Sequence, residues 1–372
     1  MSLLRTPLFD WHRNHGGRMV EFGGWEMPVQ YSSIVDEHVA VRKSAGLFDI
    51  SHMGRLSFRG NDAMKLLNHL LTCRVDNLID GQIRYGLVCN DAGGILDDIL
   101  VNRINATSFG MVVNASNRLK IVDWINQHAS QIAGANGGQP DVDFQDHTTE
   151  TAMLAVQGPQ ALGLVGQITK ADLTSMKYYS GRELTIEGQA AFVSRTGYTG
   201  EDGFELIVPN VLATGLWEQF LSAGHSAGLK PCGLGCRDTL RLEAAMPLYG
   251  HELSESIDPL TAGLSFAVKC ENREFIGRDA LVKIADQPNP PVRVGLRLSS
   301  RRIAREHSEV FGQEQRIGEV TSGTFSPTLE QSIAMAYVDT SHAGLGSQVE
   351  IDIRGKREPA EVVALPFYKR AK

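Results

Sequence analysis

The sequence has few cysteines, and their arrangement suggests neither a disulfide framework nor a metal centre. Five are scattered over the 372 residues, at Cys73, Cys89, Cys232, Cys236 and Cys270. An odd, irregular set is not typical of a disulfide-stabilised fold. Cys232 and Cys236 form a C-x3-C pair, but no second pair of Cys or His follows nearby, as a structural zinc site would need. We therefore expect free thiols, no bound metal and a reducing compartment.

Long apolar runs are also missing. No window reaches the roughly 18 apolar residues of a membrane span. The N-terminal stretch MSLLRTPLFDWHRNHGGRM lacks the apolar core of a secretory signal. These features predict no membrane association and a cytoplasmic location in a bacterium, although an organellar protein without its presequence would look the same.

Neither sign of charge is in large excess. The formal net charge is −7, from 36 basic and 43 acidic residues, which does not favour nucleic-acid binding. Motifs for serine-based acyl transfer, metal hydrolysis and phosphate-binding loops are missing. The composition, 42% hydrophobic and 21% charged, is that of an ordinary globular protein. At about 150 residues per domain, the length suggests two or three domains.

A β-hairpin is predicted at Cys89–Ile104, where apolar runs flank the turn sequence NDAGG. Its second strand carries Asp97 and Asp98 side by side among apolar residues. Side chains alternate across a strand, so the two carboxylates should point to opposite faces. One of them is then buried or lines a cleft, which is costly without a partner and often functional. The alternative is that both lie at an exposed end of the hairpin.

An acidic, glycine-rich loop is predicted at Gly197–Glu205, with the sequence GYTGEDGFE. Its three acids do not suit a bound anion, but a carboxylate can accept paired hydrogen bonds from an amidine-like edge. A 2-amino-4-oxo-pteridine or a guanidinium has such an edge. The sequence leaves open an internal ion pair of Glu205 with Arg237 or Arg241. For His52, which stands alone after Ile50 and Ser51, a structural hydrogen-bonding role is favoured over ligand binding.

The apolar periodicity also predicts the order of the larger units. Helical spacing predicts helices over residues 62–73, 118–133, 210–228 and 234–246. The segment DQPNPP at 286–291 is the best linker candidate. The short, regularly spaced apolar runs beyond it favour a small β-barrel or sandwich. A polar, glycine-rich stretch at 133–141 separates two units before the linker.

Several long segments carry a family resemblance. They read RTPLFDWHRNHGGRMVEFGGWEMPVQY, GLFDISHMGRL, CNDAGGILDDILV, GYTGEDGFE, GLGCRDTLRLEAAMPLYGHEL, DPLTAGLSFAVK, FIGRDAL and IGEVTSGTFSPTL. Through them the sequence resembles the aminomethyltransferase (T-protein) family of the glycine cleavage system, nearly from end to end. Several long matches in the right order are far more specific than a single glycine-rich loop.

The resemblance implies an α+β fold of three domains, arranged as a cloverleaf around a central folate-binding channel. Two interleaved α+β domains are expected within residues 1–285, with a rough division near 135–150. The linker at 286–291 then leads to a C-terminal β-barrel at 292–372.

The resemblance also implies the reaction. An aminomethyl group on the lipoyl arm of a carrier, the H-protein, gives its methylene carbon to tetrahydrofolate. The products are ammonia, 5,10-methylenetetrahydrofolate and the dihydrolipoyl carrier. Tetrahydrofolate is a co-substrate here, and neither metal nor flavin is expected.

Three residues receive roles from the resemblance. Asp98, the second Asp of GGILDD, is implied to be the catalytic carboxylate near folate N5 and N10. Glu205 looks like the carboxylate that binds the pterin edge. Arg237 looks like a second ligand-contacting residue.

The remaining implied ligand contacts are mostly aromatic. Tyr85, Asn114 and Tyr198 match positions that line the channel. Tyr198 could instead be a core residue with a hydrogen-bonded hydroxyl. In the C-terminal tail, Tyr368 and Arg370 match a ligand-contacting segment that varies within the family.

The main alternative is a non-catalytic relative, a folate-binding protein of iron–sulfur cluster maintenance. Such relatives carry a Cys motif of the K-G-C-Y-x-G-Q type. The corresponding stretch here, Glu274–Arg278, has no cysteine, and Cys270 lies too far upstream to restore the motif. This favours the transferase. Fused flavin-dependent oxidases with the same fold carry a large flavin domain that 372 residues do not supply.

One basic cluster could recognise the carrier. Arg301, Arg302 and Arg305 lie close together in the last domain, and H-proteins are typically acidic. We hypothesise that these arginines form a docking patch, the alternative being a solvated, charged turn.

Overall fold

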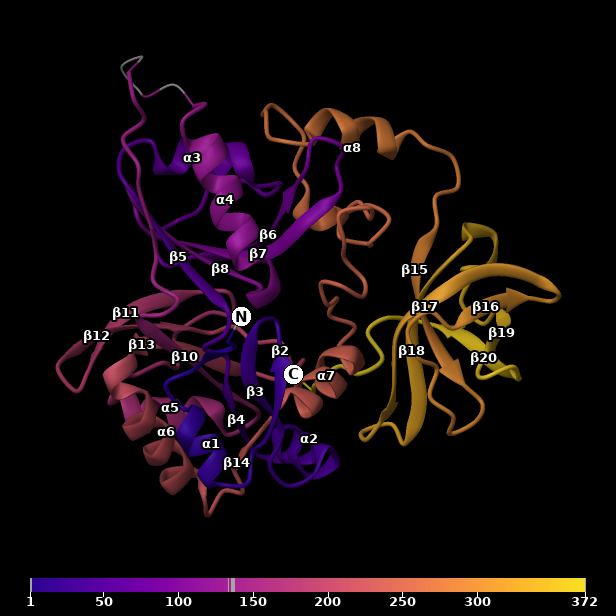
Figure 1. Cartoon of the computed structure of the whole chain (residues 1–372), viewed down its shortest axis with the longest axis horizontal. Coiled ribbons are helices and arrows are strands. Elements are labelled where there is room, and N and C mark those ends of the chain that lie inside the picture. The colour runs from indigo at the N-terminus through magenta and orange to yellow at the C-terminus, as the bar shows by residue number, and fades with distance from the viewer. Residues whose placement is uncertain (1, 133, 135–137, 372) are drawn as a thin grey trace.

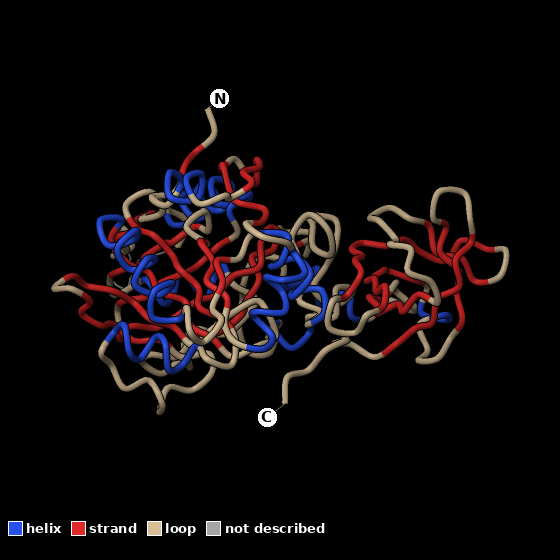
Figure 2. The backbone as a smooth tube through the Cα atoms, turned by 90° about the horizontal axis from the view of Figure 1, so that it is seen from below, coloured by secondary structure: helices blue, strands red, loops and turns tan. Residues whose placement is uncertain are grey.

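Three β-rich units make up the protein, and the computed structural model describes them over residues 2–132, 134 and 138–371. Two units are sheets covered by helices, and the third is a closed barrel at the C-terminal end (Figure 1). The barrel forms a lobe beside the other two units (Figure 2). The expected α+β fold with a small C-terminal barrel is confirmed. Within the described ranges, no helix is long and apolar enough to cross a membrane.

The first unit is built on a six-stranded sheet. Its strands, in spatial order, are β11 (Gly181–Ile186), β12 (Gln189–Ser194), β13 (Gly203–Pro209), β10 (Thr151–Gln157), β4 (Gly46–Asp49) and β14 (Lys230–Pro231). Helices α5 (Ala161–Thr169) and α6 (Asn210–Gly224) pack on it. The apolar stripe of α6, which includes Leu216, Trp217 and Phe220, is fully buried against this sheet.

A small N-terminal sheet completes this unit. It consists of β1 (Leu4–Arg5), β3 (Trp25–Gln30) and β2 (Arg18–Phe22), together with helix α1 (Phe9–Asn14). Two further helices, α2 (Ile34–Lys43) and α7 (Leu234–Glu243), pack against each other, and α7 also lies on β3. Helix α7 therefore sits between the N-terminal region and the barrel (Figure 1).

The second unit is a five-stranded sheet formed by one continuous stretch of chain. Its strands, in spatial order, are β6 (Ile83–Cys89), β7 (Ile95–Asn105), β8 (Ser108–Val113), β5 (Gly54–Arg59) and β9 (Asp143–Asp146). Helices α3 (Ala63–Leu70) and α4 (Arg118–Ala129), the latter preceded by the short helix η1 (Ala115–Asn117), share its core. The predicted hairpin is the antiparallel pair β6–β7.

The five-stranded sheet interrupts the six-stranded one in sequence. Strand β4 pairs with β10, yet all of β5 to β9 lie between them in the chain. A single division near 135–150 would therefore place β4 with the wrong sheet. Part of that boundary, residues 135–137, lies outside the described residues.

The third unit is a closed barrel. Its strands, around the barrel, are β15 (Val292–Leu298), β18 (Gln331–Val338), β17 (Gln315–Ser326), β16 (Glu309–Gly312), β19 (Gln348–Asp352) and β20 (Arg357–Val363). A short helix, η3 (Thr340–His342), follows β18. The stretch before the barrel contains η2 (Ser265–Ala267) and helix α8 (Arg278–Ala285). After β20 the tail returns to α7, where the Tyr368 amide donates a hydrogen bond to the Glu243 carbonyl at 2.8 Å.

The four predicted helices are present, and all four end earlier than expected. Helix α3 ends at Leu70, α6 at Gly224 and α7 at Glu243. The helix predicted over 118–133 ends at Ala129, and residue 133 itself lies outside the described residues. After α3 the apolar pattern continues past the end of the helix because residues 71–73 are also buried, whereas residues 225–228 after α6 are exposed. Periodicity alone therefore does not fix where a helix ends.

Candidate functional site

A cavity of about 860 Å³ lies where the three units meet. Six of the predicted site residues line it: Tyr85, Asp98, Asn114, Tyr198, Glu205 and Arg237. The barrel contributes Arg293, Thr321 and Ser322 to the wall. Residues from three regions of the sequence are thus brought to one space.

Strand β7 places its two aspartates differently. Asp98 lines the cavity, whereas Asp97 is fully buried behind it. This agrees with the predicted alternation, and it excludes the exposed-end alternative. Burial, together with the negative charge of Asp98, raises the pKa of Asp97 well above its usual range.

Asparagines from the end of β8 and from η1 hold both carboxylates. The Asn114 amide nitrogen Nδ2 donates to Asp97 Oδ1 at 2.8 Å and to Asp98 Oδ1 at 2.7 Å. The Asn114 backbone N–H and Asn117 Nδ2 donate to Asp97 at 3.0 and 2.7 Å. Asn114 therefore couples the position of the buried aspartate to that of the cavity aspartate. Sequence reasoning misses Asn117, which lies on η1 three residues after Asn114.

Two aromatic residues cover Asp98. The Tyr85 hydroxyl donates to Asp98 Oδ2 at 3.1 Å. The ring of Tyr85 stacks on Phe266, with centroids 5.9 Å apart, and Phe266 is 63% exposed. Burial raises the pKa of Asp98, while the hydrogen bonds from Tyr85 and Asn114 lower it; burial dominates, so the net shift is upward. A carboxyl group with a raised pKa is suited to moving protons near neutral pH.

Another wall of the cavity holds a carboxylate, a guanidinium and an aromatic face. Glu205 on β13 is buried, and its Oε2 accepts a hydrogen bond from Thr196 at 2.5 Å. The Arg237 guanidinium carbon lies 4.8 Å from the centroid of the Tyr198 ring. Tyr198 also donates its hydroxyl to the Pro247 carbonyl at 2.5 Å, so both interpretations of this residue hold in part. Burial raises the pKa of Glu205 and lowers that of Arg237.

The internal ion pair of Glu205 that the sequence left open is not formed in the described part of the chain. Arg241 binds Glu252 at 2.8 Å and Asp238 at 2.8 Å, and Arg237 makes no ion pair there. Glu205 and Arg237 both face the cavity instead. This set of one acceptor, one donor and one aromatic face matches the edge and face of a planar heterocycle.

The other two acids of the GYTGEDGFE loop are neutralised internally. Glu201 binds Arg42 at 2.9 Å, and Asp202 binds Arg195 at 2.5 Å. Glu201 and Asp202 therefore do not contribute free carboxylates to a ligand site, contrary to what the acidic composition of the loop suggests. Only Glu205 offers its carboxylate to the cavity.

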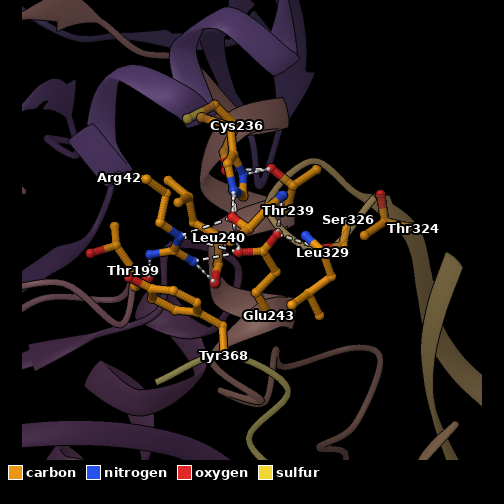
Figure 3. A network of polar contacts seen from close by, with 12 residues as sticks. Arg42, Thr199, Cys236, Thr239, Leu240, Glu243, Thr324, Ser326, Leu329 and Tyr368 are labelled. Atoms are coloured by element: carbon orange, nitrogen blue, oxygen red, sulfur yellow. Dashed lines mark hydrogen bonds and ion pairs between the residues drawn. The ribbon is translucent and has the colours of Figure 1, made fainter. Parts of the chain in front are cut away.

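A buried polar network, which we call the α7 hub, surrounds Glu243 at the end of α7 (Figure 3). Glu243 on α7 accepts hydrogen bonds from Arg42 at 2.8 Å, from Ser326 at 2.5 Å and from the Thr328 hydroxyl at 2.8 Å. His38 contacts the same carboxylate at 3.2 Å. The hub thus joins α2, α7 and the barrel.

Tyr368 belongs to the hub and does not line the cavity. Its ring lies on the Arg42 guanidinium at 4.0 Å, and its hydroxyl donates to Glu201 at 2.7 Å. Arg370 of the same tail approaches Asp202 at 3.5 Å. The structure therefore does not bring Tyr368 together with the other six predicted site residues.

The predicted role of His52 was wrong in one respect. The side chain is only 2% exposed and lines the cavity, yet no hydrogen bond from either ring nitrogen occurs within the described residues. The lone histidine is thus not a structural hydrogen-bonder.

Cys232 and Cys236 lie with Glu37 in a buried cluster, which the sequence spacing did not reveal. The Glu37 carboxylate already accepts hydrogen bonds from three backbone N–H groups, those of residues 31, 32 and 233. The two thiols pack among apolar side chains such as Val41 and Phe48. This environment favours a structural role for the cluster.

Comparison with known proteins identifies the family. The model of the GCVT N-terminal domain matches residues 8–272, and the glycine cleavage T-protein C-terminal barrel domain matches residues 292–369. An aminomethyltransferase of Streptomyces coelicolor is 48% identical over 376 residues, covering 100% of this chain and 99% of the relative. One from Bacillus cereus is 45% identical over 375 residues and covers 100% of both. The chain belongs to the glycine cleavage T-protein family.

A solved structure supports this assignment. The glycine cleavage system aminomethyltransferase T of Bartonella henselae superposes with a TM-score of 0.91 at 33% identity, covering 99% of each chain. This member of the T-protein family is accordingly an enzyme, an aminomethyltransferase of the glycine cleavage system. The relatives carry the transferase name, and no observation favours the iron–sulfur alternative.

The three arginines of the suggested docking patch have different surroundings in this T-protein. Arg302 binds Glu358 at 3.3 Å, and the Arg301 guanidinium lies 5.5 Å from the centroid of Phe325. Arg305 lines the cavity. The patch hypothesis therefore rests on Arg301 and Arg302, which are exposed.

Proposed function

We propose that tetrahydrofolate binds in the central cavity with its pterin edge on Glu205 and Arg237 and its ring against Tyr198. A carboxylate suits the paired N–H donors of the 2-amino-4-oxo edge, and a guanidinium suits its carbonyl. The buried wall excludes water, which strengthens each of these hydrogen bonds.

Asp98 is proposed as the catalytic carboxylate. The observation that carries this role is its position, in the same cavity as Glu205 and Arg237 and oriented by Tyr85 and Asn114. Its raised pKa allows it to accept and return protons as folate N5 and N10 become bonded to carbon. An ionised Asp98 also stabilises positive charge on the transferred methylene group.

The proposed reaction balances without an oxidant or a metal. The methylene carbon leaves the lipoyl sulfur and the amine nitrogen, and it forms bonds to N5 and N10 of tetrahydrofolate. The two hydrogens released from N5 and N10 end on the amine, giving ammonia, and on the sulfur, giving the dihydrolipoyl group. The protein positions the two substrates and moves these protons.

The carrier is proposed to be lipoylated H-protein, whose arm would bring the aminomethyl group to Asp98. Phe266 supports an entry point, because its exposed ring stacks on Tyr85, which in turn binds Asp98. An apolar arm gains contact area on such a ring.

The test is ammonia release from aminomethylated H-protein and tetrahydrofolate. We expect the wild type to release ammonia and Asp98→Asn to lower kcat by at least about 100-fold, a typical contribution of general acid–base catalysis. Asp286→Asn, in the exposed segment after α8, is the matched control and should be unchanged. Near-normal turnover by Asp98→Asn would remove Asp98 from the mechanism, and a wild type that releases no ammonia would refute the proposed reaction.

A further inference from the structure

His52 lines the cavity and has hydrogen-bonding capacity that the described part of the chain does not use. Its ring nitrogen Nδ1 is buried without a partner, and the ring packs edge-on against Phe22 with centroids 5.6 Å apart. The side chain follows β4 and lines the same cavity as Arg237.

Two other buried histidines, His12 and His38, have partners on both ring nitrogens, whereas the Nε2 of His128 on α4 has none within the described residues. His12 contacts Asp49 at 2.9 Å through Nε2 and Tyr31 at 2.8 Å through Nδ1. His38 contacts Thr239 and Thr328 at 2.8 Å through its two nitrogens. A buried polar group without a hydrogen bond costs about 1–3 kcal/mol, so an unpaired imidazole in a cavity calls for a ligand that completes it.

The surroundings keep the imidazole neutral. Burial, and then the positive charges of Arg237 and Arg55, lower the pKa of His52 to about 3, although Asp49 opposes them. Asp49 is itself engaged by His12 and by the Thr6 hydroxyl, at 2.9 and 2.6 Å. A neutral imidazole offers one N–H donor and one acceptor nitrogen.

The donor and acceptor of the neutral His52 ring add to the hydrogen-bonding groups that Glu205 and Arg237 present to the cavity. Glu205 only accepts hydrogen bonds when ionised, and Arg237 only donates them. A ring that carries both N–H groups and lone pairs along one edge needs a partner of each kind. His52 and Arg237 line the same cavity.

We propose that His52 is a further ligand-binding residue, which hydrogen-bonds a polar atom of the pterin bound in the cavity. This inference rests on the proposed function, because it takes tetrahydrofolate as the occupant. It assigns to His52 a role in binding the co-substrate and none in holding the fold together.

The experiment measures tetrahydrofolate binding by calorimetry with two matched pairs of variants. His52→Asn and His52→Leu have similar shapes and differ in hydrogen bonding, as do His52→Gln and His52→Met. We expect both apolar variants to bind tetrahydrofolate about tenfold or more weakly than wild type, which corresponds to about 1.4 kcal/mol. At least one amide variant should regain most of the affinity. The thermal stability of the apolar variants should equal or exceed that of wild type, because an unpaired polar group has been removed.

His128→Leu is the control for removing a buried histidine. This residue lies on α4, outside the cavity lining, and its Nε2 is also unpaired. The His128→Leu variant should bind tetrahydrofolate with the same affinity as wild type. Binding by His52→Leu and His52→Met within twofold of wild type would overturn the proposal, as would an equal loss in the apolar and amide members of both pairs. A wild type that binds no tetrahydrofolate would instead refute the proposed function, so the two failures can be told apart.

Discussion

Asn114 is the residue through which the two aspartates of β7 act on each other. One amide group donates to both carboxylates. Hydrogen bonds to the charged form of an acid lower its pKa and so oppose the effect of burial. The ionisation of Asp98 therefore depends on a side chain that comes from a different strand.

Replacing Asn114 by the similarly shaped Leu should raise the pKa of Asp98 further. If the ionised form is the active one, the acidic limb of the kcat profile moves to higher pH, by about one unit for the loss of one hydrogen bond. The measurement is kcat for ammonia release between pH 5.5 and 9. Asn61→Leu, an exposed asparagine outside the cavity lining, should leave the profile in place. An unchanged acidic limb in Asn114→Leu would show that this amide does not control Asp98.

His52 should also affect the acid sensitivity of the fold. Its pKa of about 3 in the folded protein lies below the ordinary value of 6.5, so the unfolded chain binds an extra proton between these values. Stability from this group is fully present above pH 6.5 and falls by up to about 1.4 kcal/mol per pH unit below it. The free energy of unfolding, measured with urea at pH 5, 6 and 7, should depend less steeply on pH for His52→Leu than for wild type. The same pH dependence of the unfolding free energy in both proteins would show that His52 is not held neutral.

At the residue scale, the sequence predicts which residues line the cavity better than it predicts their hydrogen-bond and ion-pair partners. Asp98, Glu205 and Arg237 could be named through the family resemblance, and all three line the cavity. Periodicity could not reveal that Arg42 neutralises Glu201, since the two residues are far apart in the chain. Nor could it show that His52 lacks a partner, because hydrogen bonding depends on the packed neighbours.

Helix α7 connects the cavity wall with the buried hub. Arg237, near its start, faces the cavity, and Glu243, at its end, holds Arg42 and His38. Burial raises the pKa of Glu243, but hydrogen bonds from His38 and Ser326 and the charge of Arg42 lower it to about 2. Its stabilising contribution is thus fully present above the unfolded value near 4.5 and is lost as the pH falls toward about 2.

Glu243→Ala should destabilise the protein by about 3–5 kcal/mol, because it leaves buried positive charge uncompensated. Urea unfolding at pH 7 measures this loss. Glu218→Ala is the control on a neighbouring helix; Glu218 is exposed on α6, and its removal should cost less than about 0.5 kcal/mol. A cost below about 1 kcal/mol for Glu243→Ala would mean that the hub contributes little to the fold.

The elements themselves were largely predictable, and their ends were not. The hairpin β6–β7 followed from a turn between two apolar runs. The start of α7 at Leu234 also agrees with the pattern. Its last residue, Glu243, is contacted by the tail, whose Tyr368 amide donates a hydrogen bond to the Glu243 carbonyl from more than a hundred residues away. Such a contact leaves no local signal.

At the scale of the whole molecule, the surface of the C-terminal barrel is one candidate docking site for the carrier. If Arg301 and Arg302 attract an acidic H-protein, charge reversal at both should raise the apparent KM for the carrier and flatten its dependence on salt. Arg354→Glu, in an exposed turn of the same barrel, is the matched control. An unchanged salt dependence in the double variant would reject the docking patch, whatever its effect on kcat.

The arrangement of the units was predictable only through the family resemblance. One boundary did not need the resemblance, because the proline-rich segment before Val292 by itself indicated a separate C-terminal unit. The pairing of β4 with β10 could not be read from either strand, because both are short apolar runs with many alternative neighbours.

That pairing has a consequence for how the chain emerges from the ribosome. Strand β4 ends at Asp49, whereas its neighbour β10 begins at Thr151. At about 5–20 residues per second, roughly 5–20 s of synthesis separates the two. The five-stranded sheet is complete before β10 exists, so the inserted unit can mature first while the N-terminal segment waits with β4 unpaired. A nascent chain stalled in this interval would expose an apolar edge, and chaperones that bind such edges have their longest opportunity there.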